Sequence, residues 1–292
     1  MRLDDLDPSD NVRDLGVGSG GGGGLGGLGG LIGFLPLLLG RKMGCGTVLI
    51  IGAVIAFFMF SGGGLGIMGG QQAGQEQASG AAKACDTEAE LFSCRVLEST
   101  EQTWTEVFRE QGASYQPATL NFYSRGANSG CGAAQSAMGP FYCPPDQGIY
   151  LDTQFFSELE TRMGAAGDVA QAYVIAHEVG HHIQGLTGQL DKARQLQARA
   201  SQAEGNAIQV QVELTADCYA GVWVGRNRDR LEAGDIEEGL RAAHQIGDDT
   251  LMRSAGQAPV ESMFTHGSSE QRMAALKKGI ESGNPSACEN LG

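Results

Sequence analysis

The chain contains little charge, and the charge that it has is mostly acidic. Charged residues make up 18% of its 292 residues, and 34 Asp and Glu outnumber 20 Lys and Arg, so the formal net charge is −14. A strongly acidic protein repels polyanions, which excludes nucleic acid as a ligand. Glycine is abundant instead, with 46 residues. Most of this excess gathers near the N-terminus, which indicates local low complexity and not a fibrous protein.

Two stretches near the N-terminus lack charge altogether. The first runs from Gly16 to Gly40 and the second from Met43 to Met68. A membrane-spanning helix needs about 20 predominantly apolar residues, so we expect one transmembrane helix over residues 43–69. The apolar part of the first stretch, Leu25–Leu39, is shorter and contains Pro36, and we expect it to be interfacial or disordered. Residues 1–42 are therefore expected to form a Gly-rich low-complexity segment.

The basic residues predict how this helix is oriented. Arg41 and Lys42 stand immediately before it, and the next basic residue is Lys83. The positive-inside rule then leaves the N-terminus in the cytoplasm and the rest of the chain outside, periplasmic or extracellular, as a single-pass protein of the inner or plasma membrane. A cleaved signal peptide is the alternative. It would need an unusually long charged N-terminal region, and no A-x-A cleavage site follows closely.

The cysteines agree with an exported domain. Cys45 lies at the predicted membrane helix, and the other six lie beyond it. An even number of cysteines in an oxidising compartment indicates disulfides. No histidine stands near Cys131 and Cys143 at zinc-finger spacing, and Cys218 differs in helix position from the acidic residues discussed below. We favour disulfides over metal ligation for all six, in the pairs Cys131–Cys143, Cys218–Cys288 and Cys85–Cys94.

The hydrophobic pattern predicts an α+β domain that is mainly helical. Residues 70–84 are rich in Gly, Gln and Ala and should form a linker, which leaves residues 85–292 for the domain. Apolar residues recur at helical spacing in most of it. Two short segments alternate like strands; these are Thr119–Ser124 and Gly148–Asp152.

The run HEVGHH predicts a zinc site. It falls in a segment expected to be helical, from Val169 to about Leu186, and residues four apart lie on one face of a helix. His177 and His181 are so placed, and imidazole nitrogens are good ligands for Zn²⁺. Glu178 stands beside the first ligand, where a carboxylate can take a proton from water. His182 points to another side of the helix, so we interpret it as a structural hydrogen-bonding residue.

A catalytic zinc site of this type needs a third protein ligand. The candidate is Glu213, with Asp217 one helical turn further on, where it would accept a hydrogen bond from the other ring nitrogen of a ligand histidine. The alternative is that both are acidic residues on the solvated face of a helix. Their occurrence beside a complete HExxH motif favours the metal site.

Four segments together resemble a known family. They are GPFYCPPDQGIYLD (139–152), AQAYVIAHEVGHHIQ (170–184), VELTADCYAGVW (212–223) and FTHGSSEQR (264–272). The pattern HExxH followed by ExxxD is similar to that of the glutamate-ligand zincins, and the four segments resemble the bacterial neutral zinc metallopeptidases from about Asp86 onwards. The resemblance implies a zincin fold with His177, His181 and Glu213 as zinc ligands. Glu178 would be the general base, and Asp217 would support a ligand.

The remaining roles are less determined by the sequence. A zinc peptidase needs a donor for the oxyanion that forms on the attacked carbonyl. His266 is our first choice, with Arg272 and Tyr219 as alternatives. His244 has no partner motif and is interpreted as non-catalytic. The strand at Gly148–Asp152 is the candidate edge that receives the backbone of the substrate by strand addition.

These features predict a membrane-anchored metallopeptidase with one Zn²⁺. It would hydrolyse peptide bonds of a peptide or protein substrate with a zinc-activated water. The alternative is a catalytically silent envelope scaffold or assembly factor that keeps zinc for structure. A fourth protein ligand that closes the site would favour this alternative, and His182 is the nearby candidate.

Overall fold

The computed structural model of the protein describes residues 1–17, 84–136, 139–163 and 167–289. They belong to one compact unit, which comprises Met1–Gly18 and Ala78–Gly292. The predicted transmembrane helix at 43–69 and nearly all of the linker at 70–84 lie outside the described residues. Within the described residues, no helix has the length and the hydropathy needed to span a membrane.

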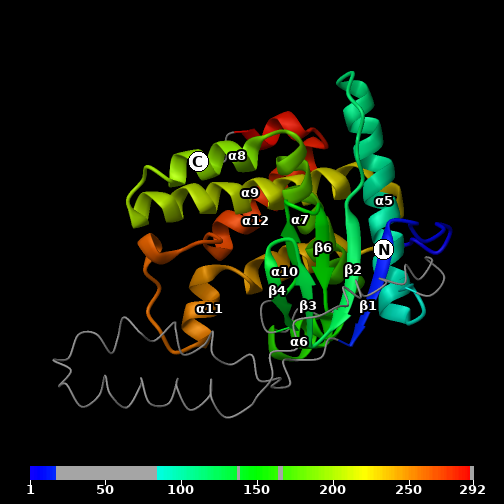
Figure 1. Ribbon diagram of the computed structural model, residues 1–292, viewed down its shortest axis with the longest axis horizontal. Coiled ribbons are helices and arrows are strands. Elements are labelled where there is room, and N and C mark those ends of the chain that lie inside the picture. Colours follow the sequence, from blue (N-terminus) through cyan, green and yellow to red (C-terminus); the bar gives the residue numbers. More distant parts are fainter. Residues whose placement is uncertain (18–83, 137–138, 164–166, 290–292) are drawn as a thin grey trace, which may run out of the picture. The chain divides into compact units, whose positions relative to one another are not determined.

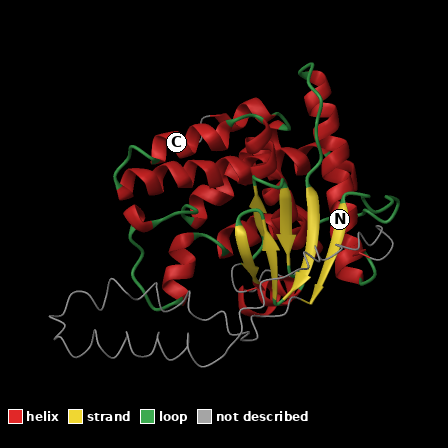
Figure 2. Cartoon of the chain, viewed as in Figure 1, coloured by secondary structure: helices red, strands yellow, loops and turns green. Residues whose placement is uncertain are grey.

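The described residues form an α+β fold in which helices predominate, as the sequence predicts. The strands are β1 (Val12–Val17), β2 (Thr119–Ser124), β3 (Gly126–Ser129), β4 (Gly132–Gln135), β5 (Phe141–Cys143) and β6 (Gly148–Leu151). The α-helices are α5 (Glu88–Glu110), α6 (Gln154–Met163), α7 (Asp168–Leu186), α8 (Gln189–Gln197), α9 (Gln202–Arg226), α10 (Asp235–Gln245), α11 (Asp248–Ser254) and α12 (Ser269–Ser282). Figures 1 and 2 show the strands beside α5, with α8, α9 and α12 gathered on the other side of α7.

The main sheet has four strands in the order β1-β2-β6-β5. β1, β2 and β6 are parallel, whereas β5 runs antiparallel to β6. The strand at Gly148–Leu151 is therefore an interior strand, with neighbours on both sides, and the prediction that it is the substrate-binding edge is wrong. The edge strand next to β6 is β5, and β1 forms the opposite edge of the sheet. The sequence pattern does not reveal β5 because it has only three residues.

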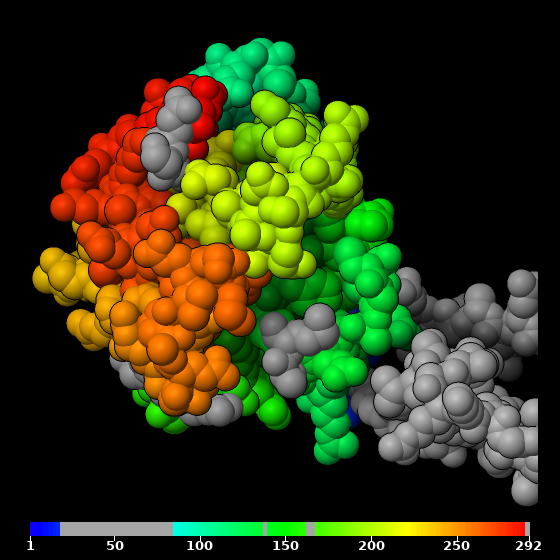
Figure 3. Space-filling view, turned by 90° about the vertical axis from the view of Figure 1, so that its left-hand side faces the viewer, coloured from blue at the N-terminus to red at the C-terminus, as the bar shows by residue number. Residues whose placement is uncertain are grey.

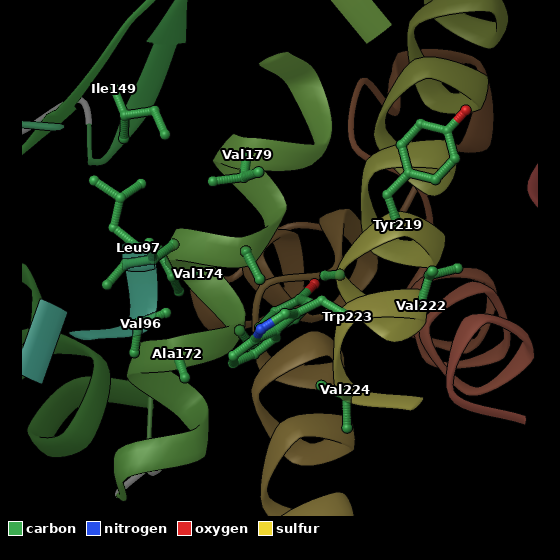
Figure 4. Close-up of a cluster of buried hydrophobic side chains, with 14 of the residues drawn as sticks. Val96, Leu97, Ile149, Ala172, Val174, Val179, Tyr219, Val222, Trp223 and Val224 are labelled. Carbon is green, nitrogen blue, oxygen red and sulfur yellow. The ribbon is translucent and has the colours of Figure 1, made fainter. Parts of the chain in front are cut away.

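The core lies where the sheet meets α5, α7 and α9. Leu97 of α5, Ile149 of β6 and Trp223 of α9 are each at most 1% exposed, and Figure 4 shows side chains from these elements around α7. The indole nitrogen of Trp223 donates to Oγ of Ser99 over 3.0 Å, so the buried polar group is satisfied. This packing holds α7, which carries HEVGHH, between the sheet and α9.

The N-terminal residues belong to this domain, which corrects the predicted domain boundaries. β1 pairs with β2 over the register Val12↔Leu120 and Arg13↔Asn121. Leu3 and Val12 are 2% and 4% exposed and are part of the core. The first 17 residues are therefore not a low-complexity segment. Composition obscured this strand because the glycine run that follows dominates the first 42 residues.

The position of β1 also bears on the predicted orientation in a membrane. A single crossing at 43–69 would place β1 and β2 on opposite sides of the bilayer. Strands that share backbone hydrogen bonds lie on the same side, so the single-pass arrangement with a cytoplasmic N-terminus is incompatible with this sheet. Attachment to a membrane and the compartment of the domain stay predictions.

The six cysteines outside the predicted membrane helix form three disulfides. They join Cys85 to Cys94, Cys131 to Cys143 and Cys218 to Cys288. These are the pairs expected from the sequence. The second bond ties the β3–β4 hairpin region to β5, and the third ties α9 to the C-terminal turn. Both bonds brace elements that carry or border the predicted zinc site.

Candidate metal centre and cleft

Helix α7 carries three of the predicted site residues. His177 and His181 lie one turn apart on it, with ring centroids 4.7 Å from each other. The helix begins after Gly167, whose φ is 120°, and the carboxylate of Glu238 accepts from the amide of Ala170 in its first turn. Most of the side chains on α7 are buried, so the helix is held on several sides.

Helix α9 brings the third predicted ligand to the site, because it crosses α7 at a very short distance. A Cβ added to Gly180, the glycine of HEVGHH, would lie 2.8 Å from the carbonyl oxygen of Ala216. The absence of a side chain at Gly180 therefore lets the two backbones approach. At the N-terminus of α9, Ser201 and Glu204 form a capping box. The close approach places Glu213 opposite the two histidines.

The three predicted ligands converge on one point. Oε2 of Glu213 lies 3.2 Å from Nε2 of His177 and 3.5 Å from Nε2 of His181. Two donors that each bind Zn²⁺ at its usual distance in a tetrahedron are about 3.3 Å apart. Two imidazoles and one carboxylate at these separations fit a three-ligand zinc site. The structure thus brings the three predicted ligands together, and their binding of zinc stays a prediction.

Each ligand is held by a second side chain. Oδ1 of Asp217 lies 2.7 Å from Nδ1 of His177, as predicted. Oε1 of Gln184 lies 2.9 Å from Nδ1 of His181, and the amide of Gln209 donates to Oε1 of Glu213 over 2.9 Å. A histidine that donates from Nδ1 keeps the lone pair of Nε2 for the metal.

Gln184 and Gln209 are not among the residues predicted from the sequence. Their spacing contained the signal, because Gln184 follows His181 by three residues and Gln209 precedes Glu213 by four. Residues three or four apart are neighbours on a helix surface. The amide of Gln184 also donates to the carbonyl of Val212 over 2.8 Å, which links α7 to α9 beside the site.

Arg272 contacts Asp217, the residue that holds His177, and its hydrogen bonds leave it unavailable as an oxyanion donor. Its guanidinium, 3% exposed, donates to both carboxylate oxygens of Asp217 over 2.8 and 2.9 Å. Tyr173 donates its hydroxyl to the same carboxylate. Tyr219, the other alternative, does not line the cleft, and its hydroxyl accepts from the amide of Gln189.

The electrostatics of the three ligands favour a cation among them. Burial opposes the charged form of His177, but the carboxylates of Asp217 and Glu213 outweigh it and raise its pKa to about 10. Burial opposes the charge of Glu213 too, yet the two histidines hold the pKa of its carboxyl well below the ordinary value. The carboxylates thus attract positive charge to this point, whether a proton or a metal ion supplies it.

Glu178 points into the same site from the first turn of the motif. It is 7% exposed and lines the cleft with both histidines. Burial raises the pKa of its carboxyl above the ordinary value. A carboxyl with a raised pKa is suited to accept a proton and return it near neutral pH.

A cleft of about 540 Å³ opens over the site. Phe141 and Tyr142 of β5 form part of one wall, and residues of α8, among them Leu190 and Arg194, form part of another. Figure 3 shows the mouth as a hollow between the yellow-green α8 region, the orange α11 region and the green strands. The edge strand β5 and the predicted zinc ligands therefore face one space.

His266 lines this cleft as well, as its predicted role requires. Its side chain is 52% exposed, and its Nδ1 lies 3.3 Å from Oδ1 of Asp248. The other oxygen of Asp248 accepts the backbone amides of Thr265, His266 and Gly267 at 2.6 to 3.0 Å. Asp248, which is not among the predicted site residues, therefore fixes both the turn and the ring of His266.

His182 is structural, as interpreted from the sequence. One ring nitrogen lies 3.1 Å from the hydroxyl of Tyr142 and the other 2.6 Å from the carbonyl of Gln116. Burial lowers the pKa of this histidine, which keeps the ring neutral. His182 thus joins α7 to the edge strand β5 and has no ring nitrogen left for the metal. His244 is exposed on α10 and does not line the cleft.

Comparison with known proteins agrees with this site. Residues 1–291 match the family described as "Putative neutral zinc metallopeptidase". The chain belongs to this family. Because the match includes residues 1–17, the neutral zinc metallopeptidase family shares the N-terminal part that supplies β1.

Similar proteins match most or all of the chain. The chain is 42% identical to the uncharacterized protein YpfJ of Escherichia coli K12, over all of this chain and 99% of that protein. It is 35% identical to the uncharacterized proteins Rv2575 of Mycobacterium tuberculosis and Mb2605 of Mycobacterium bovis, over 69% of this chain and 71% of each relative. No solved structure matches the chain. The comparisons therefore support the family and the zinc, and the activity is a proposal.

Proposed function

We propose that the protein is a zinc-dependent peptidase that binds one Zn²⁺ and hydrolyses peptide bonds of peptide or protein substrates. The observation that carries the proposal is the convergence of His177, His181 and Glu213 beside Glu178 in an open cleft. Family membership supports the same activity. When bound, the zinc supplies a Lewis acid that polarises a carbonyl and acidifies water.

Residues of the chain provide proton transfer, stabilisation of the oxyanion and positioning of the ligands. Glu178 takes the proton of the attacking water and delivers it to the leaving amine. His266, held by Asp248, donates a hydrogen bond to the oxyanion that develops on the scissile carbonyl. The ligands are kept in position by Asp217, Gln184 and Gln209.

The edge strand β5 supplies the binding surface for the substrate backbone. An extended peptide adds to an exposed sheet edge through main-chain hydrogen bonds. β5 ends the four-stranded sheet and lines the cleft through Phe141 and Tyr142. The link from Tyr142 to His182 sets the distance between this edge and α7. The disulfide at Cys143 anchors the edge further.

The alternative is a zinc-containing scaffold or assembly factor without turnover. A closed site with a fourth protein ligand would favour it. His182 was the nearby candidate, and its ring nitrogens contact Tyr142 and Gln116 instead. A closed structural zinc site would also not need an open cleft over Glu178 and His266. Both observations favour the peptidase.

Hydrolysis of an unfolded protein substrate tests the proposal. The wild-type protein with zinc is expected to cleave casein, and a chelator is expected to stop it until zinc is returned. Glu178→Gln is the matched variant, because it removes the base and keeps the ligands. It should hold about one zinc per chain and lose at least about 100-fold in rate. Cleavage at the wild-type rate by this variant, or a zinc-loaded protein without activity on casein and a peptide library, would refute the peptidase.

A further inference from the structure

Helix α8 forms part of one wall of the cleft and is held at both ends. At its start the amide of Gln189 donates to the hydroxyl of Tyr219 over 2.8 Å. At its end the amide of Gln197 donates to Oε1 of Gln209 over 3.1 Å, and Gln209 in turn donates to Glu213. None of the side chains of α8 is buried. These hydrogen bonds therefore set the place of α8 relative to the predicted zinc ligands.

One face of α8 points into the cleft. Its members are three or four residues apart, which is the spacing of a single helical face; they are Leu190, Ala193, Arg194 and Gln197. Lys192 is exposed on the opposite side of the helix and does not line the cleft. The helix thus offers one basic side chain to the cleft and turns another away from it.

Arg194 is the cleft arginine whose charge is free to meet a ligand. Among the described residues, the other arginine that lines the cleft is Arg272, which is buried and bound to Asp217. Nη1 of Arg194 lies 3.4 Å from Oδ1 of Asp191, and these two side chains are 56% and 74% exposed. Exposed ion pairs of this kind hold their partners weakly. A carboxylate that enters the cleft can therefore replace Asp191.

Arg194 also lies near the edge strand β5. A Cβ added to Gly185 would lie 3.2 Å from the hydroxyl of Tyr142 and 3.8 Å from Cδ1 of Leu190, so β5 and α8 meet over this glycine of α7. Arg194 follows Leu190 by one helical turn. Burial and the charge of Asp146 raise the pKa of Tyr142 to about 12, and the charge of Arg194 opposes them. The guanidinium is thus close enough to act on a side chain of the edge strand.

An extended peptide on β5 would direct side chains towards α8. Successive side chains of a strand point to opposite faces of the sheet. On β5, the ring of Phe141 stacks on Tyr150, whereas Tyr142 contacts His182 of α7. A peptide that pairs with β5 would therefore point every second side chain to the side where α7 and α8 lie. On that side Arg194 is the positive group that such a side chain meets.

We propose that Arg194 binds a carboxylate of the substrate, so that the cleft selects peptides with an acidic side chain or a free C-terminus near the scissile bond. A guanidinium can hold a carboxylate by two parallel hydrogen bonds. The protein has a net charge of −14, and Glu178 and Glu213 place two carboxyl groups in the cleft. An acidic substrate is repelled by these charges unless a cation receives it. The inference rests on the proposed peptidase function and adds the class of substrate.

Peptide binding to the Glu178→Gln variant tests this recognition without cleavage. The full chain is loaded with zinc, and binding of labelled peptides is measured by fluorescence anisotropy. One set carries a single Glu at each position in turn of a neutral sequence with a C-terminal amide, and a matched set carries Gln. A third peptide is the neutral sequence with a free C-terminus. We expect Glu at one position, or the free C-terminus, to bind at least about 10-fold tighter than the neutral amide.

Variants of α8 show whether Arg194 causes this preference. Arg194→Gln should remove it, and Arg194→Glu should reverse it in favour of a peptide with Lys at the same position. Lys192→Gln is the matched control, because it removes one positive charge from the same helix outside the cleft, and it should keep the preference. Equal binding of all peptides, binding of none, or an equal loss in Arg194→Gln and Lys192→Gln would overturn the proposal.

The same peptides identify the source of the carboxylate and separate this proposal from the peptidase activity. A gain from an internal Glu identifies an acidic side chain, whereas a gain from the free C-terminus alone identifies the end of the substrate. Cleavage of each peptide by the chain with Glu178 intact is measured separately. A preference in binding without cleavage would refute the peptidase and support recognition by Arg194. Cleavage without a preference in binding would support the peptidase and overturn the role of Arg194.

Discussion

Asp217 lies between His177 and Arg272 and contacts both. Its carboxylate is 2.7 Å from Nδ1 of the histidine and accepts two hydrogen bonds from the guanidinium. All three side chains are buried. The charge of Arg272 holds the pKa of Asp217 at about 2 although burial opposes its ionisation. The carboxylate is thus kept ionised and held against Nδ1 of His177, a proposed zinc ligand.

Asp217→Asn is therefore expected to weaken zinc binding by about 10–100-fold. The variant loses the charge that orients His177 and stabilises its bound form. It also leaves Arg272 as a buried guanidinium without its counter-charge, so the free energy of unfolding should fall by about 3–5 kcal/mol. Competition with a chelator of known affinity measures the first effect, and denaturant unfolding of the metal-free protein measures the second.

The double variant Asp217→Asn, Arg272→Met separates the two effects. It removes both buried charges, so stability should recover in part whereas zinc affinity should stay low. If affinity recovers together with stability, Asp217 acts on the fold and not on the ligand.

His266→Ala should lower kcat by about 100–1000-fold, as expected for loss of a donor to the oxyanion. KM and zinc content should change little, because His266 is not among the three converging ligands. Asp248→Asn, which weakens the hold on the ring, should give a smaller loss in kcat. His244→Ala is the control, since this exposed histidine lies outside the cleft. An equal loss in both histidine variants would remove His266 from the mechanism.

Glu101 makes the stability of the domain depend on pH. Burial raises the pKa of its carboxyl to about 7, although Asn11 and Ser9 donate hydrogen bonds to it. Between about pH 4.5 and pH 7 the folded state holds this proton more tightly than the unfolded state does. The contribution of Glu101 to stability is therefore present below pH 4.5 and is lost as the pH rises to about 7.

Glu101→Gln removes this titration. At pH 8 the variant should be more stable than the wild type by about 1–2 kcal/mol, and at pH 4 the two should agree. Chemical denaturation at both pH values measures the difference. A variant that is less stable at pH 8 would show that the ionised carboxylate is the better acceptor for Ser9 and Asn11.

Gly279 of α12 allows the closest contact between α12 and α9. A Cβ at this position would lie 2.0 Å from the carbonyl oxygen of Cys218, within the helix that carries Glu213 and Asp217. Gly279→Ala should lower the free energy of unfolding by at least about 1–3 kcal/mol, because α12 must move. It should also weaken zinc binding, because Arg272 moves with α12.

Gly205→Ala on α9 is the matched control, because nothing lies within 4 Å of its added Cβ. Alanine favours a helix over glycine by about 1 kcal/mol, so this variant should be slightly more stable than the wild type. Thermal unfolding of both variants gives the comparison. Equal effects at the two positions would contradict the close contact at Gly279.

Local spacing accounts for much of what was predictable here. His177, Glu178 and His181 share a helical turn, so their arrangement follows from the 3.6-residue period alone. Glu213 and Asp217 likewise share one face of a single helix. The pairing of Cys131 with Cys143 and of Cys85 with Cys94 also agrees with short separations in the chain. Such features need no knowledge of distant contacts.

Other features depended on surfaces that meet only in the folded chain. β1 and β2 are separated by about a hundred residues. No local pattern reveals that β1 pairs with β2 and becomes an edge strand of the sheet. The order β2-β6-β5, which places β5 at the edge opposite β1, depends in the same way on which strands share hydrogen bonds. The close approach of α7 and α9 at Gly180, and the burial of Arg272 behind Asp217, follow from the shape of facing helices. A sequence period specifies which side of one element is apolar, whereas packing selects the partner that covers it.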